Sequence, residues 1–252
     1  MPSITGQSVF ILGGSSGIGY AIADLCLREN ARVAIASSSQ SKLDHAIQRL
    51  RNSVPHSAQN ISAYAIDLNS EDVEASLEKL LSEVTKQGSE PLDHIINTAG
   101  KPDMRDFASI DLQFLIKSAQ LPVFVPLLLA KVGAKFLKEG YTSSMIFTSG
   151  QVAEKPMQGQ AVMTAYATAV NGLTKNLACD LAPRRVNCVS PGATATELWG
   201  DYADMLTSMA TQKSLLGKPG SPEEVAEAYL YLMKNTDATG SIVSSNAGSV
   251  LK

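Results

Sequence analysis

A glycine-rich run from Gly13 to Gly19 lies near the start of this 252-residue chain. It directly follows a β-rich segment, residues 9–12, and a helix is predicted to begin within it. Glycine allows the main chain to turn sharply and allows another group to approach the backbone closely. The N-terminus of the following helix offers free N–H groups and positive potential, which suit a phosphate. The run therefore predicts either a tight strand-to-helix turn or a nucleotide phosphate loop.

The same alternation of short strand and longer helix continues along the chain. Further strands are predicted at 33–35, 61–66, 94–96, 145–147 and 185–189, and apolar residues between Val73 and Val84 follow helical spacing. Strands separated by helices imply parallel pairing, and apolar strand runs fit a sheet buried on both faces. We predict an α/β fold, a single doubly wound Rossmann-type domain over residues 1–252 with a parallel sheet and helices on both faces. Residues 197–219 interrupt the alternation before a helix that begins at Ser221, and we predict that they form a substrate lid.

Composition restricts the class of partner. The net charge of −3 disfavours a nucleic-acid partner, and the three cysteines, Cys26, Cys179 and Cys188, have neither disulfide-scaffold nor metal spacing. The longest apolar run, residues 121–130, is too short for a bilayer span, and no signal peptide is visible. We expect a cytoplasmic protein with no metal, no membrane and no nucleic acid.

Five ordered motifs lie along the chain: Gly13–Gly19, Asp67–Leu68, Asn97–Gly100, Arg185–Thr196 and Lys218–Leu232. Together they resemble the short-chain dehydrogenase/reductase family over essentially the whole chain, with Leu12 where threonine is usual. This resemblance implies binding of a nicotinamide dinucleotide. NAD-preferring members carry an acid where this chain has Ser37, so NADP(H) is favoured over NAD(H), although the arginine usual in NADP-preferring members is also missing at Ser38. The cofactor-binding residues implied are Gly13, Ser15, Ser16, Gly17, Ile18, Gly19, Ser37, Ser38, Asp67, Leu68, Asn97, Ala99, Gly100, Pro191, Gly192, Thr194 and Thr196.

The family's catalytic positions are altered. Family members use a serine, a tyrosine thirteen residues later, a lysine four residues after that, and an asparagine on the preceding long helix. When Ser149 and Leu173 are matched to the family's spacing, these slots fall on Gly150, Met163, Ala167 and a position near Pro122. No lysine lies between Lys155 and Lys175, so the usual Tyr–Lys proton donor cannot form.

Three residues are candidates for replacing it: Ser149, Tyr166 and Gln151. Each has a structural alternative, since Ser149 would satisfy the strand end, Tyr166 would pack in a helix interface, and Gln151 would be a solvated loop residue. Five further polar residues follow the fourth and fifth predicted strands, at the carboxyl end of the sheet, and each has the same alternative of a solvated loop residue. They are Lys101, Asp103, Arg105, Glu154 and Lys155.

The resemblance extends to atypical fungal members, some of which are iminium reductases or cyclases. We therefore expect an NADP(H)-dependent oxidoreductase acting on an apolar secondary metabolite of iminium type. A non-redox cyclase or isomerase and a catalytically silent scaffold remain alternatives. Relatives pair through long helices, which implies a homodimer or homotetramer. The residues that suit an apolar pocket are Met157, Met163, Trp199, Met205 and Met209.

Overall fold

The computed structural model describes residues 2–100 and 105–252 and shows one parallel sheet of seven strands in the order β3-β2-β1-β4-β5-β6-β7. The predicted α/β class and six of the strands are confirmed; the short C-terminal strand β7 was not predicted. The strands are β1 Ser8–Leu12, β2 Arg32–Ser37, β3 Ile61–Ala65, β4 His94–Asn97, β5 Ser144–Thr148, β6 Arg185–Pro191 and β7 Ile242–Ser245.

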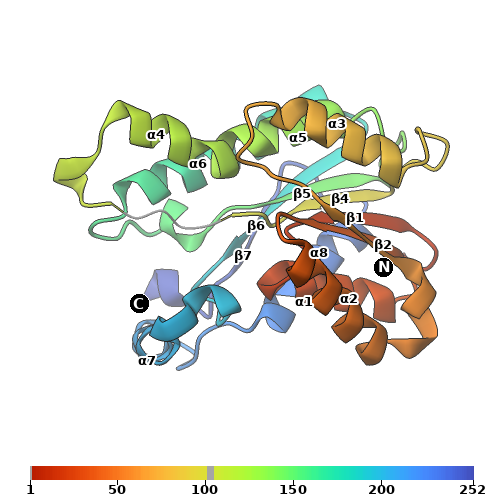
Figure 1. The fold of residues 1–252 in the computed structure, drawn as a ribbon. Coiled ribbons are helices and arrows are strands. Elements are labelled where there is room, and N and C mark those ends of the chain that lie inside the picture. Colours follow the sequence, from red (N-terminus) through yellow and green to blue (C-terminus); the bar gives the residue numbers. More distant parts are fainter. Residues whose placement is uncertain (1, 101–104) are drawn as a thin grey trace.

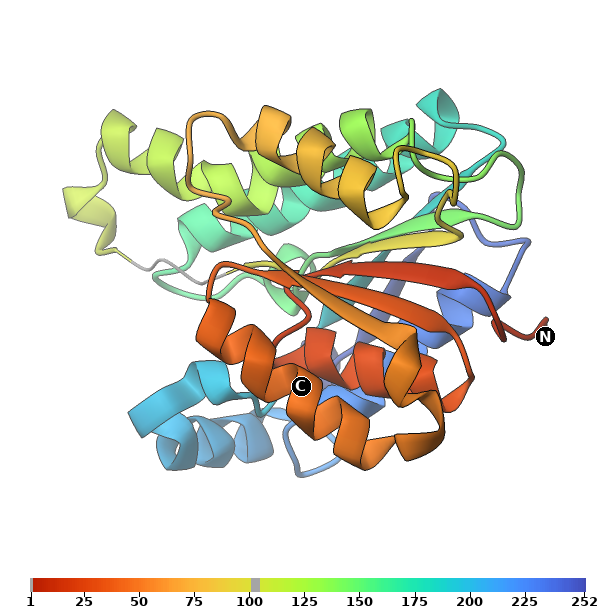
Figure 2. The same cartoon turned by 45° about the vertical axis from the view of Figure 1, so that its right-hand side comes forward.

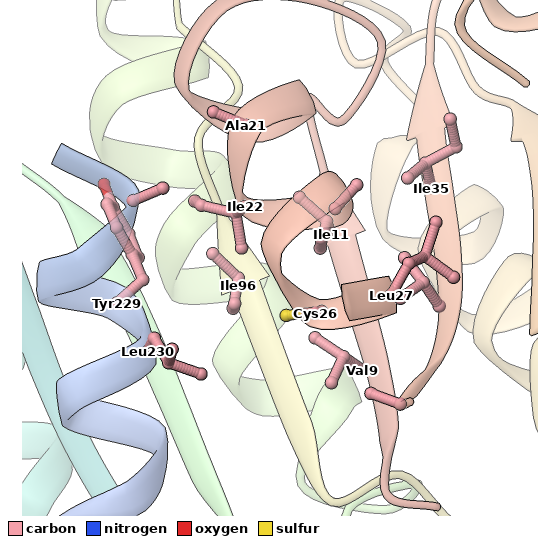
Figure 3. Packing of buried hydrophobic residues seen from close by; sticks show 14 of the residues in the cluster. Val9, Ile11, Ala21, Ile22, Cys26, Leu27, Ile35, Ile96, Tyr229 and Leu230 are labelled. Atoms are coloured by element: carbon pink, nitrogen blue, oxygen red, sulfur yellow. The ribbon is translucent and has the colours of Figure 1, made fainter. Parts of the chain in front are cut away.

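Helices cover both faces of the sheet (Figures 1 and 2). One face carries α1 Gly17–Arg28, α2 Gln40–Ser53 and α8 Pro222–Lys234, and the other carries α3 Val73–Val84, α4 Leu112–Ala119, α5 Val125–Gly133 and α6 Ala161–Asp180. Figure 3 shows Ile22 and Cys26 of α1 beside Tyr229 and Leu230 of α8, all against the strands. Strand β1 is buried at every position, as expected for a sheet covered on both sides.

The segment predicted to form a lid contains helix. The segment 197–219 holds a 3₁₀ turn, Glu197–Tyr202, and α7 Ala203–Lys213, which lies near the C-terminus in Figure 1. Residues 52–60 hold the end of α2 and a 3₁₀ turn, Pro55–Asn60. The predicted start of α8 is confirmed, because Ser221 accepts a hydrogen bond from Glu224 N and the Glu224 carboxylate accepts one from Ser221 N.

The helices α4 and α5 form one apolar helix, Leu112–Gly133, joined by a π-helical turn at Gln120–Phe124. Within the described residues this is the one helix long and apolar enough to cross a bilayer. Its buried residues Val125, Leu129 and Val132 pack in the core with α3, so the α5 part of this helix belongs to the core of the domain. Pro122 lies in the π-helical turn, where the normal hydrogen-bond ladder is already interrupted.

The buried histidine of β4 predicts acid sensitivity. His94 Nδ1 lies 2.8 Å from Ser144 Oγ and Nε2 lies 2.8 Å from Gln7 Oε1, and burial lowers the pKa of His94 to about 3. In the unfolded chain the pKa of histidine is near 6.5. Above that pH, His94 makes its full contribution to the free energy of unfolding. As the pH falls below about 6.5, this contribution decreases by about 1.4 kcal/mol per pH unit. Urea unfolding at pH 7.5 and 5.5 measures it. We expect His94→Gln to reduce the loss between these pH values and His45→Gln, an exposed control, to leave it unchanged; equal losses in all three proteins would contradict this.

Candidate active site

The backbone of the loop between β1 and α1 lies close to the backbone of the turn after β4. Gly13 has a φ of +91°, and a Cβ there would lie 2.6 Å from Ala99 N. A Cβ on Gly19 would lie 2.5 Å from Thr98 Oγ1 and would overlap Gly13 O. The loop is therefore packed against the end of β4, with the backbone N–H groups of α1 directed to its N-terminal side. Exposed Ser16 stands at the N-cap and Ile18 packs partly in the core.

The end of β2 joins this loop through serines. Ser15 Oγ donates to Ser37 Oγ at 2.8 Å, while exposed Ser38 lies beside it and Ser39 caps α2 by accepting from Lys42 N. Strand β2 ends in hydroxyl groups rather than a carboxylate, so a 2′-phosphate would meet no negative charge from this strand end.

The segment after β3 is hydrogen-bonded to the π-helical turn between α4 and α5. Asp67 Oδ1 accepts a hydrogen bond from Asn69 N at 2.9 Å. The carbonyl oxygen of buried Leu68 accepts one from Gln120 Nε2 at 2.8 Å. Gln120 also donates to Ser70 O at 3.1 Å. The π-helical turn thus positions the Asp67–Leu68 pair.

The ends of β4, β5 and α8 share one hydrogen-bond network. Asn97 Oδ1 accepts from Ala99 N at 3.1 Å, and Asn97 O accepts from Thr148 Oγ1 at 2.6 Å. Thr148 Oγ1 lies 2.7 Å from the Tyr229 hydroxyl, whose pKa burial raises well above its usual value. This network fixes the turn that continues to exposed Gly100.

The end of β6 completes the edge. After Pro191, Gly192 N donates to Ser245 O at 2.9 Å, and a Cβ on Gly192 would lie 2.7 Å from Asn246 Cα. Thr194 Oγ1 donates to Gly192 O, and Thr196 lies against Gly17. The sheet therefore gathers the predicted cofactor residues along one edge, with close backbone approaches at the phosphate loop and with hydroxyl groups at the end of β2. These features fit a dinucleotide.

The candidate catalytic side chains are engaged elsewhere. Ser149 Oγ donates to Ala167 O at 2.9 Å, and the Tyr166 hydroxyl donates to Leu115 O at 2.9 Å with Ser118 Oγ at the same distance. Tyr166 thus joins α6 to α4. The Ser149 hydroxyl thus contacts α6 and not the end of its own strand, and the Tyr166 hydroxyl contacts the neighbouring helix α4.

The loop after β5 contacts the C-terminal segment. Gln151 Oε1 accepts from the Ser249 hydroxyl, Glu154 accepts from Ser244 Oγ at 2.7 Å, and Lys155 Nζ donates to Ser249 O at 3.1 Å. Gly150 precedes this loop in an extended conformation. Lys101 and Asp103 lie outside the described residues.

A small pocket of ≈ 100 Å³ opens beside the start of α6. Its lining is Arg105, Phe107, Ile110, Gly159, Ala161, Val162 and Met163. Arg105 stacks on Phe114 at 4.0 Å and lies 3.5 Å from an Asp111 carboxylate oxygen, so its charge is partly neutralised. Met163, in the tyrosine slot of the sequence register, therefore presents a thioether to a mostly apolar pocket. Met205 and Met209 are exposed on α7 instead.

Sequence reasoning missed several residues of the site. Thr98, Thr148 and Tyr229 fix the strand ends, Gln120 supports the Asp67–Leu68 pair, and Glu197 contacts the loop between β1 and α1. The spacing of Thr98 within the turn after β4 was a usable signal. The other four act across the fold and leave no local pattern. Among the described residues no cluster of three or more His, Cys, Asp or Glu is arranged to hold a metal ion.

Comparison with known proteins agrees with this geometry. A family model described as SDR-like Rossmann domain matches residues 3–252, so the chain belongs to the short-chain dehydrogenase/reductase family. It is 41% identical to short-chain dehydrogenase/reductase ATR9 of Stachybotrys chlorohalonatus, with both chains fully covered.

Solved structures show the same fold. The structure of MalC reductase/Diels-Alderase from Malbranchea aurantiaca superposes with a TM-score of 0.93 at 34% identity, covering 99% of this chain and 97% of the other. A small-chain dehydrogenase in complex with NADPH superposes with a TM-score of 0.79 at 26% identity, covering 98% of this chain and all of the other. The family and fold imply a nicotinamide cofactor, and the chain is oxidoreductase-like.

Proposed function

We propose that this protein is an NADP(H)-dependent reductase of an apolar secondary metabolite that presents an iminium carbon. The proposal is carried by the missing proton donor. The Ser149 and Tyr166 hydroxyls are engaged with the main chain, Met163 lines the pocket, and no lysine lies between Lys155 and Lys175. The serines at the end of β2 support NADP(H), with Ser37 held by Ser15.

The chain's own residues suit a substrate that needs no proton. When bound, the dinucleotide supplies a hydride. A ketone would become an alkoxide and need a proton, whereas an iminium becomes a neutral amine. A lysine about 4 Å from such a cation would repel it by about 4 kcal/mol at an effective dielectric constant near 20, and Ala167 avoids this. Val162 and Met163 give this pocket apolar lining, which suits an apolar substrate.

A matched pair of substrates tests this proposal. NADPH oxidation is measured with 2-methyl-3,4-dihydroisoquinolinium and with 1-tetralone, which have similar ring shapes. We expect the iminium to react at least about 100-fold faster, because a positioned general acid contributes roughly 10²–10⁴ to the ketone reaction. The Met163→Tyr/Ala167→Lys variant should gain ketone reduction. Equal rates, a preference for the ketone, or no NADPH binding at millimolar concentration would contradict the proposal.

A cyclase is the second candidate, supported by the similarity to the structure titled as a reductase/Diels-Alderase. The apolar pocket would then hold a reactive diene in one conformer and act by proximity. In that case diene absorbance would decay equally fast with NADPH or NADP⁺ present, and the absorbance of NADPH would stay constant. Decay that requires NADPH consumption would exclude this candidate.

The exposed apolar side chains near α4 and α5 support a further part of the proposal. Phe107, Leu112, Ile116, Phe124 and Leu127 are exposed on this layer. We propose that a second copy covers them in a cytoplasmic homodimer or homotetramer, and that residues 197–219 act as the substrate lid.

A further inference from the structure

The N-terminus of α1 is capped by a carboxylate from a distant part of the chain. Gly17 N donates to Glu197 Oε2 at 2.9 Å, although the two residues are 180 positions apart. Ser16 occupies the N-cap position, yet its side chain makes no capping hydrogen bond. The carboxylate of Glu197 therefore stands where the helix dipole and free N–H groups favour an anion.

An arginine from α2 lies near the other oxygen of the same carboxylate. Arg49 Nη1 lies 3.7 Å from Glu197 Oε1, and its guanidinium stacks on Tyr20 of α1, 4.2 Å from the ring centroid. Two positive partners, the start of α1 and Arg49, thus surround one anion position. Glu197 occupies this position as a phosphate oxygen would, because both are charged acceptors.

The segment that carries Glu197 is close to the loop but lightly held. Thr196 Cγ2 lies 3.2 Å from the position of a Cβ on Gly17, which leaves little room between them. Leu198 and Tyr202, in the same 3₁₀ turn, are exposed, and Gly200 interrupts the turn with a φ of +47°. Moving this turn therefore uncovers little of Leu198 and Tyr202, and Trp199 is its one large side chain that is partly buried.

We propose that Glu197 is an internal competitor for the pyrophosphate of the dinucleotide, and that binding displaces it and transfers Arg49 to a pyrophosphate oxygen. Cofactor binding is then coupled to movement of residues 197–202. This inference rests on the dinucleotide binding of the proposed function and assigns Arg49 as a binding residue.

Calorimetric titration with NADPH tests the competition. We expect Glu197→Gln to tighten binding about three- to tenfold, because the amide lacks the charge that competes for the helix terminus. Glu83→Gln is the matched control, since Glu83 is exposed on α3 at the opposite face and the net charge changes equally. NADH should show the same ratio, because it shares the pyrophosphate. If Glu197→Gln tightened binding of NADPH but not of NADH, the pyrophosphate assignment would be overturned in favour of the 2′-phosphate.

The transfer of Arg49 is tested in the background that lacks the competitor. Glu197→Gln/Arg49→Gln should bind NADPH about three- to tenfold more weakly than Glu197→Gln alone. Equal affinities would show that Arg49 serves Glu197 only and would overturn the transfer. Trp199, the one tryptophan of the chain, lies in the moving turn. Its emission should respond to NADPH in the wild type, and the response should shrink in Glu197→Gln.

The results separate the two levels of inference. Wild-type binding with an unchanged Kd in Glu197→Gln overturns the competition and leaves the proposed function standing. Absence of binding in both proteins overturns both. Binding by Glu197→Gln alone supports the competition and shows that the wild-type site is closed.

Discussion

Gly19→Ala is expected to reduce dinucleotide affinity by about one to two orders of magnitude and to destabilise the fold. An added Cβ would overlap Gly13 O and lie 2.5 Å from Thr98 Oγ1, so α1 must shift away from the end of β1. A shift that breaks one charge-assisted hydrogen bond to a phosphate costs about 1.5–3 kcal/mol, and overpacking costs about 1–3 kcal/mol of stability.

Gly172→Ala is the control for this prediction. Gly172 lies within α6 and is exposed, and a Cβ there meets no atom within 4 Å. This variant should be more stable by about 0.5–1 kcal/mol and should bind the dinucleotide normally. Denaturant unfolding and NADPH titration on both variants give the comparison. Normal affinity in Gly19→Ala would mean that the loop does not hold the pyrophosphate.

Arg185→Met is expected to cost about 3–5 kcal/mol of stability, because it leaves buried carbonyl groups without a donor. The Arg185 side chain, on the first residue of β6, donates to Leu232 O at 2.6 Å, Met233 O at 3.0 Å and Asn235 O at 2.9 Å. It also donates to Tyr141 O at 2.6 Å. Burial lowers its pKa to about 10, so the guanidinium stays charged at neutral pH.

This arginine closes the C-terminal end of α8, where positive charge is favoured. It thereby ties α8 to the strand that leads to Pro191. Arg185→Lys should fall between the wild type and Arg185→Met, because an ammonium cannot reproduce the guanidinium fork. Arg51→Met, at an exposed position of α2, should change stability by less than about 0.5 kcal/mol. An Arg185→Met protein as stable as Arg51→Met would contradict this reading of the contacts.

Much of the fold followed from local patterns. Apolar runs predicted six of the strands, the spacing from Val73 to Val84 matched α3, and Ser221 with Glu224 predicted the start of α8. Strand β7 was missed because its four residues, two of them serine, carry little apolar signal. Helix α7 was missed because its apolar residues do not form a continuous stripe, and Ala210 is its one buried position.

The candidate site was only partly accessible from sequence. Glycine positions and the missing lysine could be read directly, because steric limits and residue identity are local properties. The directions of the Ser149 and Tyr166 hydroxyls could not, because each depends on which carbonyl of a packed helix lies nearby.

The sequence by itself determined the alternating α/β order, the glycine-rich turn after β1 and the loss of the Tyr–Lys pair, since these depend on periodicity, on glycine and on which residues are present. Only the tertiary structure decided that Glu197 caps α1, that Arg185 closes α8, and that Met163 lines a pocket. These contacts join residues up to 180 positions apart. They exist because packing the helices on the sheet brings charged and polar groups into hydrogen-bonding distance, which no short segment specifies alone.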